Sequence, residues 1–371
     1  MIGVAYKVSC RPVILEGAFV TGRSEGEYKY TLIKGVIPMR KIKIAQIGTS
    51  LNSHGNQIWK SITKQTDIFE VVGYALPEGE REKFPKNMAA FEGYREMTVE
   101  EILADPEIEA VTVETEEVYL TKYAQMAADA GKQIHQEKPG GIVLADFEKL
   151  INTVREKNLI FHLGYMYRYN PFVAETIGKA KDGTLGDIFT VEAQMNGAHP
   201  VVSRQWLENF PGGMMFFLGC HLIDLIMQIM GEPKNVVPYN RTTGKGGITS
   251  CDLGMAVLEY DKGIAFAKTS ANELGGFIRR NLIVSGTNGS IVLQPLENPV
   301  PGGQNTIMRE HYDPKKFSTA EATRACEPFD RYDGMMAAFA SYVRGDKENP
   351  YTYDYELLLY KTVLRACGVE V

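Results

Sequence analysis

Short apolar segments alternate with helical segments from Lys41 to about residue 163, and no other feature constrains the fold of this chain as much. The alternation is the pattern of βαβ units, whose strands lie parallel in one sheet. Strands as apolar as these are expected where helices cover both faces of a sheet. The expected strands are 42–47, 69–75, 110–114, 133–136 and 160–163, and the expected helices are 57–64, 100–104, 120–130 and 144–157.

The pattern changes after about residue 171, where longer strand-like stretches replace the alternation. Turn sequences such as Asp261-Lys262-Gly263 and Asn288-Gly289 are typical of antiparallel hairpins. The sequence thus predicts an α/β protein that joins a Rossmann-like parallel-sheet domain to an α+β domain with an open, mainly antiparallel sheet. The expected strand-like stretches are 187–195, 253–270 and 280–293, and the expected helices are 332–344 and 355–366.

The change of pattern predicts a dinucleotide-binding domain at 39–162 and a substrate and oligomerisation domain at 163–371. Residues 1–38 form an extension that contains no basic-then-apolar signal peptide. Because the sequence from Met39 onward resembles a chain start, the extension is interpreted as an artefact of an upstream start codon or as an appended segment.

Composition narrows the class of protein. A chain of 371 residues is long for one core, so two domains are expected. The net charge of -6, from 40 basic and 46 acidic residues, gives no electrostatic reason to expect nucleic acid. No apolar run approaches the ~20 residues that span a bilayer. The five cysteines are scattered without a Cys-x-x-Cys pair, which argues against disulfides and zinc and favours a cytoplasmic location.

A candidate cofactor loop follows the first expected strand, where residues 48–55 have the sequence GTSLNSHG. A dinucleotide loop needs glycines that let the backbone approach a pyrophosphate at a helix N-terminus, in the pattern Gly-x-Gly-x-x-Gly. Gly48 supplies the first glycine, but Ser50 and Ser53 occupy the other two places. A serine at positive φ costs about 1 kcal/mol. We expect Gly48, Ser50, Ser53 and His54 to contact the cofactor, with the serine hydroxyls donating to phosphate.

Two further motifs carry residue types suited to hydride-transfer chemistry. Lys138 follows an apolar strand in the peptide Glu137-Lys138-Pro139-Gly140-Gly141, and His221 opens an apolar helix within 212–225. Oxidation of an alcohol needs a base for the hydroxyl proton and a cation for the developing alkoxide. The alternatives are a solvated lysine after a strand and an ordinary hydrogen-bonded helix histidine.

These motifs resemble the Gfo/Idh/MocA family of sugar and cyclitol oxidoreductases, and the resemblance covers residues 40 to 368. It implies that Lys138 and His221 lie beside the carbon that exchanges hydride with the nicotinamide of NAD or NADP. It also implies a small carbohydrate-like substrate, C-terminal helices that pack back on the chain, and a dimer or tetramer formed through the second sheet.

The chain departs from this family at several positions. Many family dehydrogenases carry an aspartate where this chain has Phe217, one helical turn before His221. Leu76 occupies the place of the acidic residue that holds the adenosine ribose, and Glu78 or Glu80 is a possible substitute. Family members usually have Thr-Pro-Asn in a third cofactor segment, and this chain has Thr115-Glu116-Glu117 there. The resemblance implies a cofactor-binding set of Gly48, Ser50, Ser53, His54, Leu76, Thr115, Glu137 and Lys138.

Substrate contacts are expected from the second domain. Arg168 resembles an interdomain arginine of the family, although a salt bridge at the domain junction is the alternative. His199 and Trp206 fall where relatives have substrate loops, and Trp206 suits either stacking on a sugar or core packing. Asp224 shares a helix face with His221, although its family counterpart looks structural. No metal site is expected, because the methionines of 214–230 are better explained by core packing.

Three functions fit these observations. The first is an NAD(P)-dependent oxidoreductase acting on a sugar, a cyclitol or a derivative, which Lys138 and His221 favour. The second is a non-catalytic ligand sensor or scaffold that kept the fold, which is favoured by Ser50, Ser53, Leu76 and Phe217. The third is an enzyme that uses the cofactor for a redox-assisted lyase or hydrolase step, which Lys138 and His221 also favour. We take the first as the working hypothesis.

Overall fold

The computed structural model describes residues 14–24, 27–36, 40–50, 52–316 and 319–371, and the chain forms two compact units, 1–41 and 42–371. In the first unit, strands β1 (Ile14–Ser24) and β2 (Glu27–Val36) pair as an antiparallel hairpin. The predicted boundary between 38 and 39 lies outside the described residues, and so do residues 1–13 of the extension.

The second unit begins with a five-stranded parallel sheet in the order β4-β3-β5-β6-β7. Every neighbouring pair in it is parallel, so the prediction of a Rossmann-like parallel sheet is confirmed. Residues on both faces of β3 are buried, because helices cover both faces of the sheet. The strands are β3 (Ile42–Ile47), β4 (Phe69–Ala75), β5 (Ala110–Val113), β6 (Gln133–Gln136) and β7 (Phe161–Leu163).

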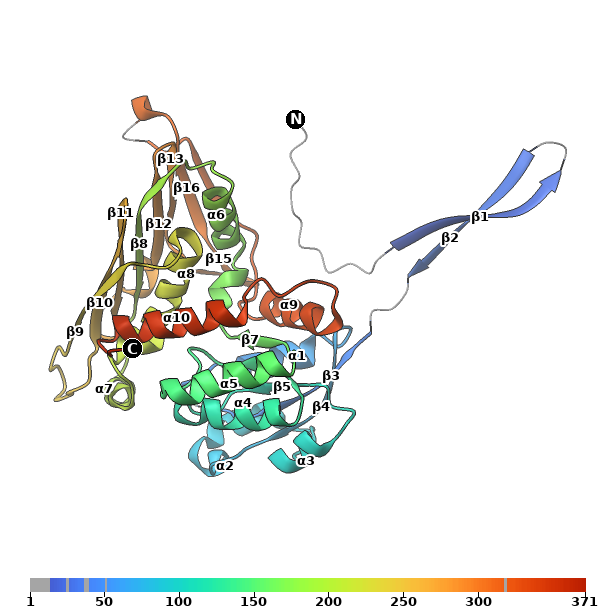
Figure 1. The fold of residues 1–371 in the computed structure, drawn as a ribbon, viewed down its shortest axis with the longest axis horizontal. Helices are drawn as coiled ribbons and strands as arrows, with labels where there is room; N and C mark the ends of the chain where they lie inside the picture. Colours follow the sequence, from blue (N-terminus) through green and yellow to red (C-terminus); the bar gives the residue numbers. More distant parts are fainter. Residues whose placement is uncertain (1–13, 25–26, 37–39, 51, 317–318) are drawn as a thin grey trace. The chain divides into compact units, whose positions relative to one another are not determined.

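Helices α4 and α5 pack together and cover the face of this sheet that is turned to the viewer in Figure 1. Helix α1 packs on α9, which contacts β3 and comes from the C-terminal end of the chain. Thr98 and Glu101 form a complete capping box at the start of α3. The helices are α1 (Gly55–Lys64), α2 (Glu80–Lys83), α3 (Val99–Ala104), α4 (Leu120–Asp129), α5 (Leu144–Glu156) and α9 (Asp333–Arg344).

An eight-stranded sheet follows, in the order β17-β16-β13-β12-β8-β11-β10-β9. Only the pair of β11 and β8 is parallel, so the predicted open, mainly antiparallel sheet is confirmed. The strands are β8 (Ile188–Asn196), β9 (Asn235–Arg241), β10 (Leu253–Tyr260), β11 (Gly263–Ser270), β12 (Asn281–Gly286), β13 (Gly289–Leu293), β16 (Ile307–His311) and β17 (Ala322–Ala325).

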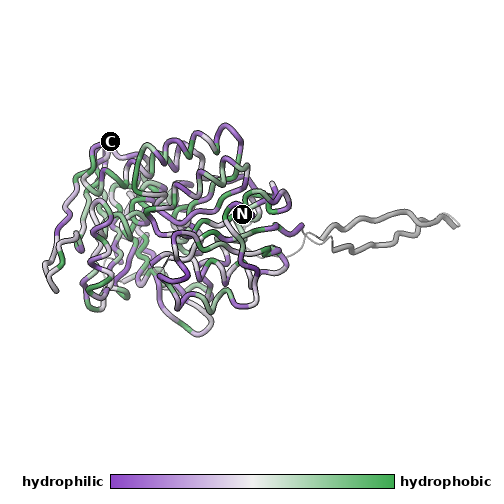
Figure 2. Tube along the Cα trace, turned by 90° about the horizontal axis from the view of Figure 1, so that it is seen from below, coloured by the Kyte–Doolittle hydropathy of each residue, from purple (hydrophilic) through white to green (hydrophobic). Residues whose placement is uncertain are grey.

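Helices α6 (Pro171–Lys181) and α8 (Cys220–Met230) lie against one face of the eight-stranded sheet (Figure 1). That face is apolar, because Val191, Ala193 and Met195 alternate with more exposed residues along β8. Figure 2 shows the same alternation of hydrophobic and hydrophilic residues along the strands of this unit. In the part of the chain that the structure describes, no helix is long and apolar enough to cross a membrane.

Helix α10 (Tyr353–Ala366) joins the two parts of the second unit. It contacts α8, β9 and α5, and the hydroxyl of Tyr360 donates a hydrogen bond of 2.9 Å to the carbonyl of Gly141. The Tyr360 ring also packs on Phe147 of α5 at 4.4 Å between ring centroids. The C-terminal helices therefore place the loop after β6 against the helices of the eight-stranded sheet.

Candidate active site

The cofactor loop begins with a glycine that the fold requires. Gly48 has a φ of 93°, and a Cβ there would lie 2.5 to 2.7 Å from atoms of Thr115. Any other residue would be strained and would clash, because Thr115 follows the neighbouring strand closely. The backbone N–H of Ser50 then donates to the carbonyl of Glu114 at 3.0 Å, which fixes the loop to the end of β5.

The hydroxyl groups of the two serines form hydrogen bonds inside the protein, with N–H groups of the loop itself and with Glu114. Ser53 Oγ donates to the Glu114 carbonyl at 3.2 Å and accepts from the N–H of Gly55 at 3.2 Å. Ser50 Oγ accepts from the N–H of Asn52 at 3.3 Å. Among the described non-glycine residues only Glu78 and Asn158 have positive φ, so the expected backbone strain at Ser50 and Ser53 is wrong. The serines replace glycine without strain because the loop keeps ordinary φ values there.

Glu80 of α2 supplies a carboxyl group at this loop. Its Oε2 accepts a 2.9 Å hydrogen bond from the N–H of Thr49, and the side chain is fully buried. Within the described chain its Oε1 has no hydrogen-bond partner. Burial raises the pKa of Glu80 to about 8. Glu78 instead pairs with Lys122 and Tyr123, and Leu76 packs on the hydrophobic core.

Lys138 lies just beyond the carboxyl end of β6 and is fully buried. Its Nζ donates a 2.7 Å hydrogen bond to the Phe217 carbonyl and lies 4.3 Å from the centre of the Phe217 ring. Glu137 Oε1 is 3.6 Å away. The glycines that follow are needed for close packing, because a Cβ on Gly140 would lie 2.4 Å from Phe147. A buried ammonium therefore contacts the helical segment that carries His221.

His221 is buried in the first turn of α8, between the rings of Tyr165 and Tyr167. No described residue forms a hydrogen bond with either of its ring nitrogens. Burial, reinforced by the charges of Lys138 and His54, holds the pKa of His221 well below its usual value. The imidazole is therefore neutral at physiological pH, and a neutral imidazole can accept a proton.

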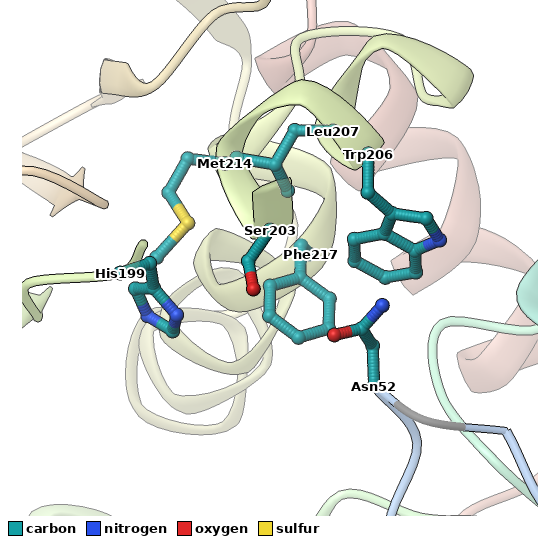
Figure 3. Close-up of a pocket in the computed structure, with 7 residues that line it drawn as sticks. All are labelled: Asn52, His199, Ser203, Trp206, Leu207, Met214 and Phe217. Carbon is teal, nitrogen blue, oxygen red and sulfur yellow. The ribbon is translucent and has the colours of Figure 1, made fainter. Parts of the chain in front are cut away.

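A cavity of about 200 Å³ lies beside Phe217. Phe217 belongs to a π-helical turn, Met215–Gly219, and such turns are frequent at functional sites. Figure 3 shows Trp206 and the Asn52 amide on one side of the cavity and His199 and Met214 on the other. The cavity is lined by Asn52, His199, Ser203, Trp206, Leu207, Met214 and Phe217.

Arg168 and Asp224 take part in a buried ion-pair network. Arg168 binds Asp224 through Nε and Nη2 at 2.8 to 3.2 Å, and Glu356 of α10 through Nη1 and Nη2 at 2.6 and 3.0 Å. The guanidinium also stacks on Tyr351 at 3.7 Å. Because these donors are already engaged with carboxylates, Arg168 and Asp224 hold three segments together and are not proposed as substrate ligands.

Comparison with known proteins identifies the family. A model described as an oxidoreductase family with an NAD-binding Rossmann fold matches residues 42–165, and the GFO/IDH/MocA C-terminal domain matches residues 179–292. Together these matches span more than half of the chain. The chain belongs to the Gfo/Idh/MocA family of oxidoreductases.

Curated relatives are about a quarter identical to this chain over the aligned residues. The scyllo-inositol 2-dehydrogenase (NADP(+)) of Bacillus subtilis is 28% identical over 239 residues, which is 62% of this chain and 63% of that enzyme. The match thus spans less than two thirds of that relative. The trans-1,2-dihydrobenzene-1,2-diol dehydrogenase of Bos taurus is 26% identical over 285 residues, 73% of this chain and 81% of that enzyme.

Solved structures of the family have the same fold. A 3-ketoreductase from Actinomadura kijaniata in complex with NADP and TDP-benzene superposes with a TM-score of 0.72 at 17% identity, covering 87% of this chain and 96% of the other. A probable oxidoreductase known as yhhX gives a TM-score of 0.70 at 20% identity, covering 89% and 97%.

Three carboxyl groups are buried near Lys138, and the sequence predicted only that of Glu137 at the site. Besides Glu137, whose Oε2 lies 3.2 Å from Nδ1 of His54, they are Glu114 and Glu117. Within the described residues neither of these two has a hydrogen bond to its carboxyl oxygens. Burial raises the pKa of Glu117 to about 8 and that of Glu114 well above its usual value. Acidic residues directly after an apolar parallel strand were the available signal.

No metal centre is evident in the described part of the family fold. Among residues 40–50, 52–316 and 319–371, no group of three or more His, Cys, Asp or Glu side chains is arranged to hold a metal ion. The positive charge of Lys138 instead acts on the pKa of all three carboxyl groups of this cluster, Glu114, Glu117 and Glu137, against the effect of burial.

Proposed function

We propose that this chain is an NAD(P)-dependent oxidoreductase that transfers hydride between nicotinamide and a small cyclic polyol, sugar or derivative. One observation carries the proposal: the buried Lys138, at the carboxyl end of the parallel sheet, is hydrogen-bonded to the helical segment that bears the neutral His221. Ligands of such sheets bind beyond the carboxyl ends of the strands. The named activities of the inositol and dihydrodiol dehydrogenases support the same reaction class.

The cofactor loop fits a dinucleotide at two points. Gly48 lets the loop backbone approach a ligand, and α1 begins just after His54. The free Oε1 of Glu80 suits a ribose hydroxyl donor, in place of the acid expected at Leu76. The remaining proposed contacts are Ser50, Ser53, Thr115, Glu137 and Lys138. When bound, the nicotinamide would accept or deliver the hydride.

The two candidate catalytic residues have complementary roles. His221 is held neutral, so it can take the hydroxyl proton of an alcohol through a free ring nitrogen. Lys138 provides a cation that stabilises the alkoxide as it forms. Because the site is buried, water does not screen this attraction.

The cavity indicates what kind of substrate fits. Its volume of about 200 Å³ lies below the ~300–1,000 Å³ of sites for drug-sized ligands, so a small ligand is expected. Trp206 and Phe217 offer aromatic faces, while His199, Ser203 and Asn52 offer polar groups. This lining suits a ring with one apolar face and a few hydroxyls. We propose His199 and Trp206 as substrate contacts, with Ser203 and Asn52 added.

The test combines cofactor binding with turnover. Fluorescence titration with NADH and NADPH measures binding, and a panel of inositols, sugars and cyclic dihydrodiols measures turnover. Lys138→Met should lower kcat by about 10² to 10⁴ and leave cofactor binding within a few-fold, because the ammonium acts on the transition state.

Lys132→Met is the matched control for Lys138. Lys132 is also buried, but its Nζ donates to the carbonyls of Asp105 and Ile108 and makes no contact with Phe217. This variant should lose stability and keep the turnover of its folded fraction. Full turnover in Lys138→Met would contradict the proposal.

A non-catalytic sensor is the second candidate. It is favoured by the serines that satisfy the loop amides internally and by the Phe217 ring that covers the amine of Lys138. A protein that binds NADH or NADPH but turns over no member of the panel would support this candidate.

We also propose that the protein is a homo-oligomer located in the cytoplasm. The face of the eight-stranded sheet opposite α6 and α8 presents Tyr239, Met255 and Ile264 to solvent, so it is suited to pair with a second copy. The cysteines that the structure describes, Cys220, Cys251, Cys326 and Cys367, are all free thiols, which fits a reducing compartment.

A further inference from the structure

Two histidines form a hydrogen-bonded pair inside the parallel sheet. His135 of β6 and His162 of β7 are register partners, and their Nδ1 atoms lie 2.8 Å apart. Both side chains are fully buried, and Phe339 of α9 stacks on the His162 ring. Only one of the two Nδ1 atoms can carry the shared hydrogen, so the rings must adopt opposite tautomers.

Each histidine of the pair has a further polar neighbour at its Nε2 atom. Nε2 of His162 lies 2.6 Å from the hydroxyl of Tyr169, a half-buried residue that ends the 3₁₀ turn Met166–Tyr169. Nε2 of His135 lies 3.6 Å from Oε1 of Glu114. This last distance is longer than a hydrogen bond, and a small rotation of the carboxyl group would close it.

Glu114 connects this row to the candidate active site. Its backbone carbonyl accepts from the N–H of Ser50 and from Ser53 Oγ, so the residue lies directly under the cofactor loop. Burial, followed by the charge of Glu137, raises the pKa of the Glu114 carboxyl well above its usual value, while Lys138 opposes this shift. This shift favours the protonated form of the carboxyl group, which can act as a donor.

Both histidines are held neutral. Burial lowers the pKa of His135 to about 4 and that of His162 well below its usual value. Neutral imidazoles have one donor and one acceptor nitrogen, and a row of such groups can pass a proton by exchanging the two roles. The proposed hydride transfer leaves this buried histidine pair without a role.

We propose that Glu114, His135, His162 and Tyr169 form a proton relay between the carboxyl cluster beside Lys138 and the protein surface. The relay rests on the proposed oxidoreductase function, since alcohol oxidation releases a proton into a buried site. The substrate O–H bond breaks as the acid–base side chain gains the proton, and that proton must then reach solvent.

The proton transfers from Glu114 through His135 and His162 to Tyr169 balance. Glu114 gives its proton to Nε2 of His135 while Nδ1 of His135 gives its own to Nδ1 of His162. Nε2–H of His162 passes to the Tyr169 oxygen as the phenol proton passes to the hydroxyl of Tyr342, the hydrogen-bond partner of Tyr169, and Tyr342 releases its own proton toward solvent. Each step breaks one X–H bond and forms another, and Glu114 is left as a carboxylate that can take up the proton that His221 received from the substrate, once that proton is released within the buried site. Proton movement in the opposite direction, as in ketone reduction, resets the tautomers.

A shorter exit competes with this path. Glu137 Oε2 lies 3.2 Å from Nδ1 of His54, whose side chain is 20% exposed. The experiment must therefore compare the two routes. His162→Gln keeps the hydrogen-bonding capacity of the ring but cannot shift a proton between two nitrogens, and Tyr169→Phe removes the surface end. His54→Gln interrupts the shorter exit.

Turnover is measured for each variant with and without added imidazole, and NADH affinity is measured by fluorescence. His162→Gln and Tyr169→Phe should lower kcat roughly 10- to 100-fold, at or below the ~10² to 10⁴ of a general acid–base group. Imidazole should restore part of the loss, and NADH affinity should stay within twofold. Thr112→Val is the control, since Thr112 is the register partner of His135 on the neighbouring strand but its hydroxyl donates to Gln46 Oε1 at 3.3 Å. This variant should keep full turnover.

The relay would be overturned if His162→Gln and Tyr169→Phe both kept a turnover within twofold of the wild type. It would also be overturned if imidazole did not restore the turnover that these variants lose. A third contradicting result is a loss of turnover that imidazole restores in His54→Gln alone. Nitrogen NMR of ¹⁵N-histidine protein decides the pairing without any turnover. One ring should be the Nδ1–H tautomer and the other the Nε2–H tautomer. Two Nε2–H rings would break the relay even in an active enzyme, whereas opposite tautomers in a protein that turns over no substrate would count against the proposed function only.

Discussion

At the scale of single residues, Phe217 alters the candidate site more than any other departure from the family pattern. Its carbonyl accepts the hydrogen bond of Lys138, its ring lies 4.3 Å from that amine, and the same residue lines the cavity. An aspartate there would pair with the ammonium, whereas here Glu137 at 3.6 Å is the near carboxylate. The cavity wall becomes apolar as a result, and ligands with one apolar face are favoured over fully hydroxylated rings.

Glu80 should make stability depend on pH. Its pKa is raised to about 8 in the folded protein, above the value of the unfolded chain, so the folded state binds more protons between about pH 4.5 and 8. Stability from this group is complete below that window and falls as pH rises through it, by at most about 1.4 kcal/mol per pH unit. Glu80→Gln keeps an acceptor for the Thr49 N–H and removes the titration. It should match the wild type at pH 5 and be more stable at pH 9, as measured by urea unfolding.

The matched control is Glu78→Gln. Glu78 is two residues away, and hydrogen bonds from Lys122 and Tyr123 lower its pKa. Because this shift has the opposite sign, Glu78→Gln should not gain stability at pH 9. Equal stability of Glu80→Gln and the wild type across pH 5 to 9 would show that the Glu80 carboxyl is not buried as described.

At the scale of elements, Arg168 ties the 3₁₀ turn Met166–Tyr169 to α8 and α10 through Asp224 and Glu356. Arg168→Met would leave two carboxylates buried without their cation. Breaking a buried pair in this way typically costs about 3–5 kcal/mol. We expect a loss of that size in urea unfolding, together with weaker docking of α10.

Arg155→Met provides the comparison for that experiment. Arg155 pairs with Asp354 at the start of the same helix, but both side chains are largely exposed. Exposed pairs contribute about 0–1 kcal/mol, so this variant should remain close to the wild type. If the two arginine variants lost the same free energy of unfolding, the buried network would not be the junction that the geometry indicates.

The parallel sheet could be predicted from the sequence because its strands are continuous apolar runs. The strands at 42–47, 69–75 and 133–136 have the predicted bounds, and β5 ends one residue early, at Val113. Strands β9, β16 and β17 were not predicted, because polar residues interrupt the apolar pattern in each of them. Helix α6 was also missed, although Asn170 caps it and Pro171 opens it.

The candidate site could be predicted only where neighbouring residues in the sequence make the pattern. Lys138 has such a pattern in its Glu, Pro and Gly neighbours. The partners of Arg168 are 56 and 188 residues away, so only the fold shows that its donors are occupied. The direction of the Ser53 hydroxyl likewise depends on Glu114, which is 61 residues away.

At the scale of the whole molecule, the division into units predicts the effect of removing the N-terminal extension. Residues 1–41 and 42–371 are separate compact units, and the hydrogen bonds of the hairpin β1–β2 are made within the first unit. A chain that begins at Met39 should therefore keep the unfolding temperature of the full chain, as measured by calorimetry. A drop of many degrees would show that residues 1–38 stabilise the family fold, and the interpretation as an artefact or appendage would be wrong.

The last prediction concerns the solvent-exposed face of the eight-stranded sheet. Tyr239 and Met255 are register partners on β9 and β10, and Ile264 on β11 is 52% exposed while its neighbour Ala265 is buried. Because side chains alternate between the two faces along a strand, these three share the face opposite α6 and α8.

Light scattering at micromolar concentration should give a multiple of the 41.3 kDa chain mass. Ile264→Asp should shift the population to the monomer, since a buried unpaired carboxylate opposes association. Leu274→Asp, at a residue outside these strands that is 84% exposed, should not. A wild type that is strictly monomeric would contradict the pairing.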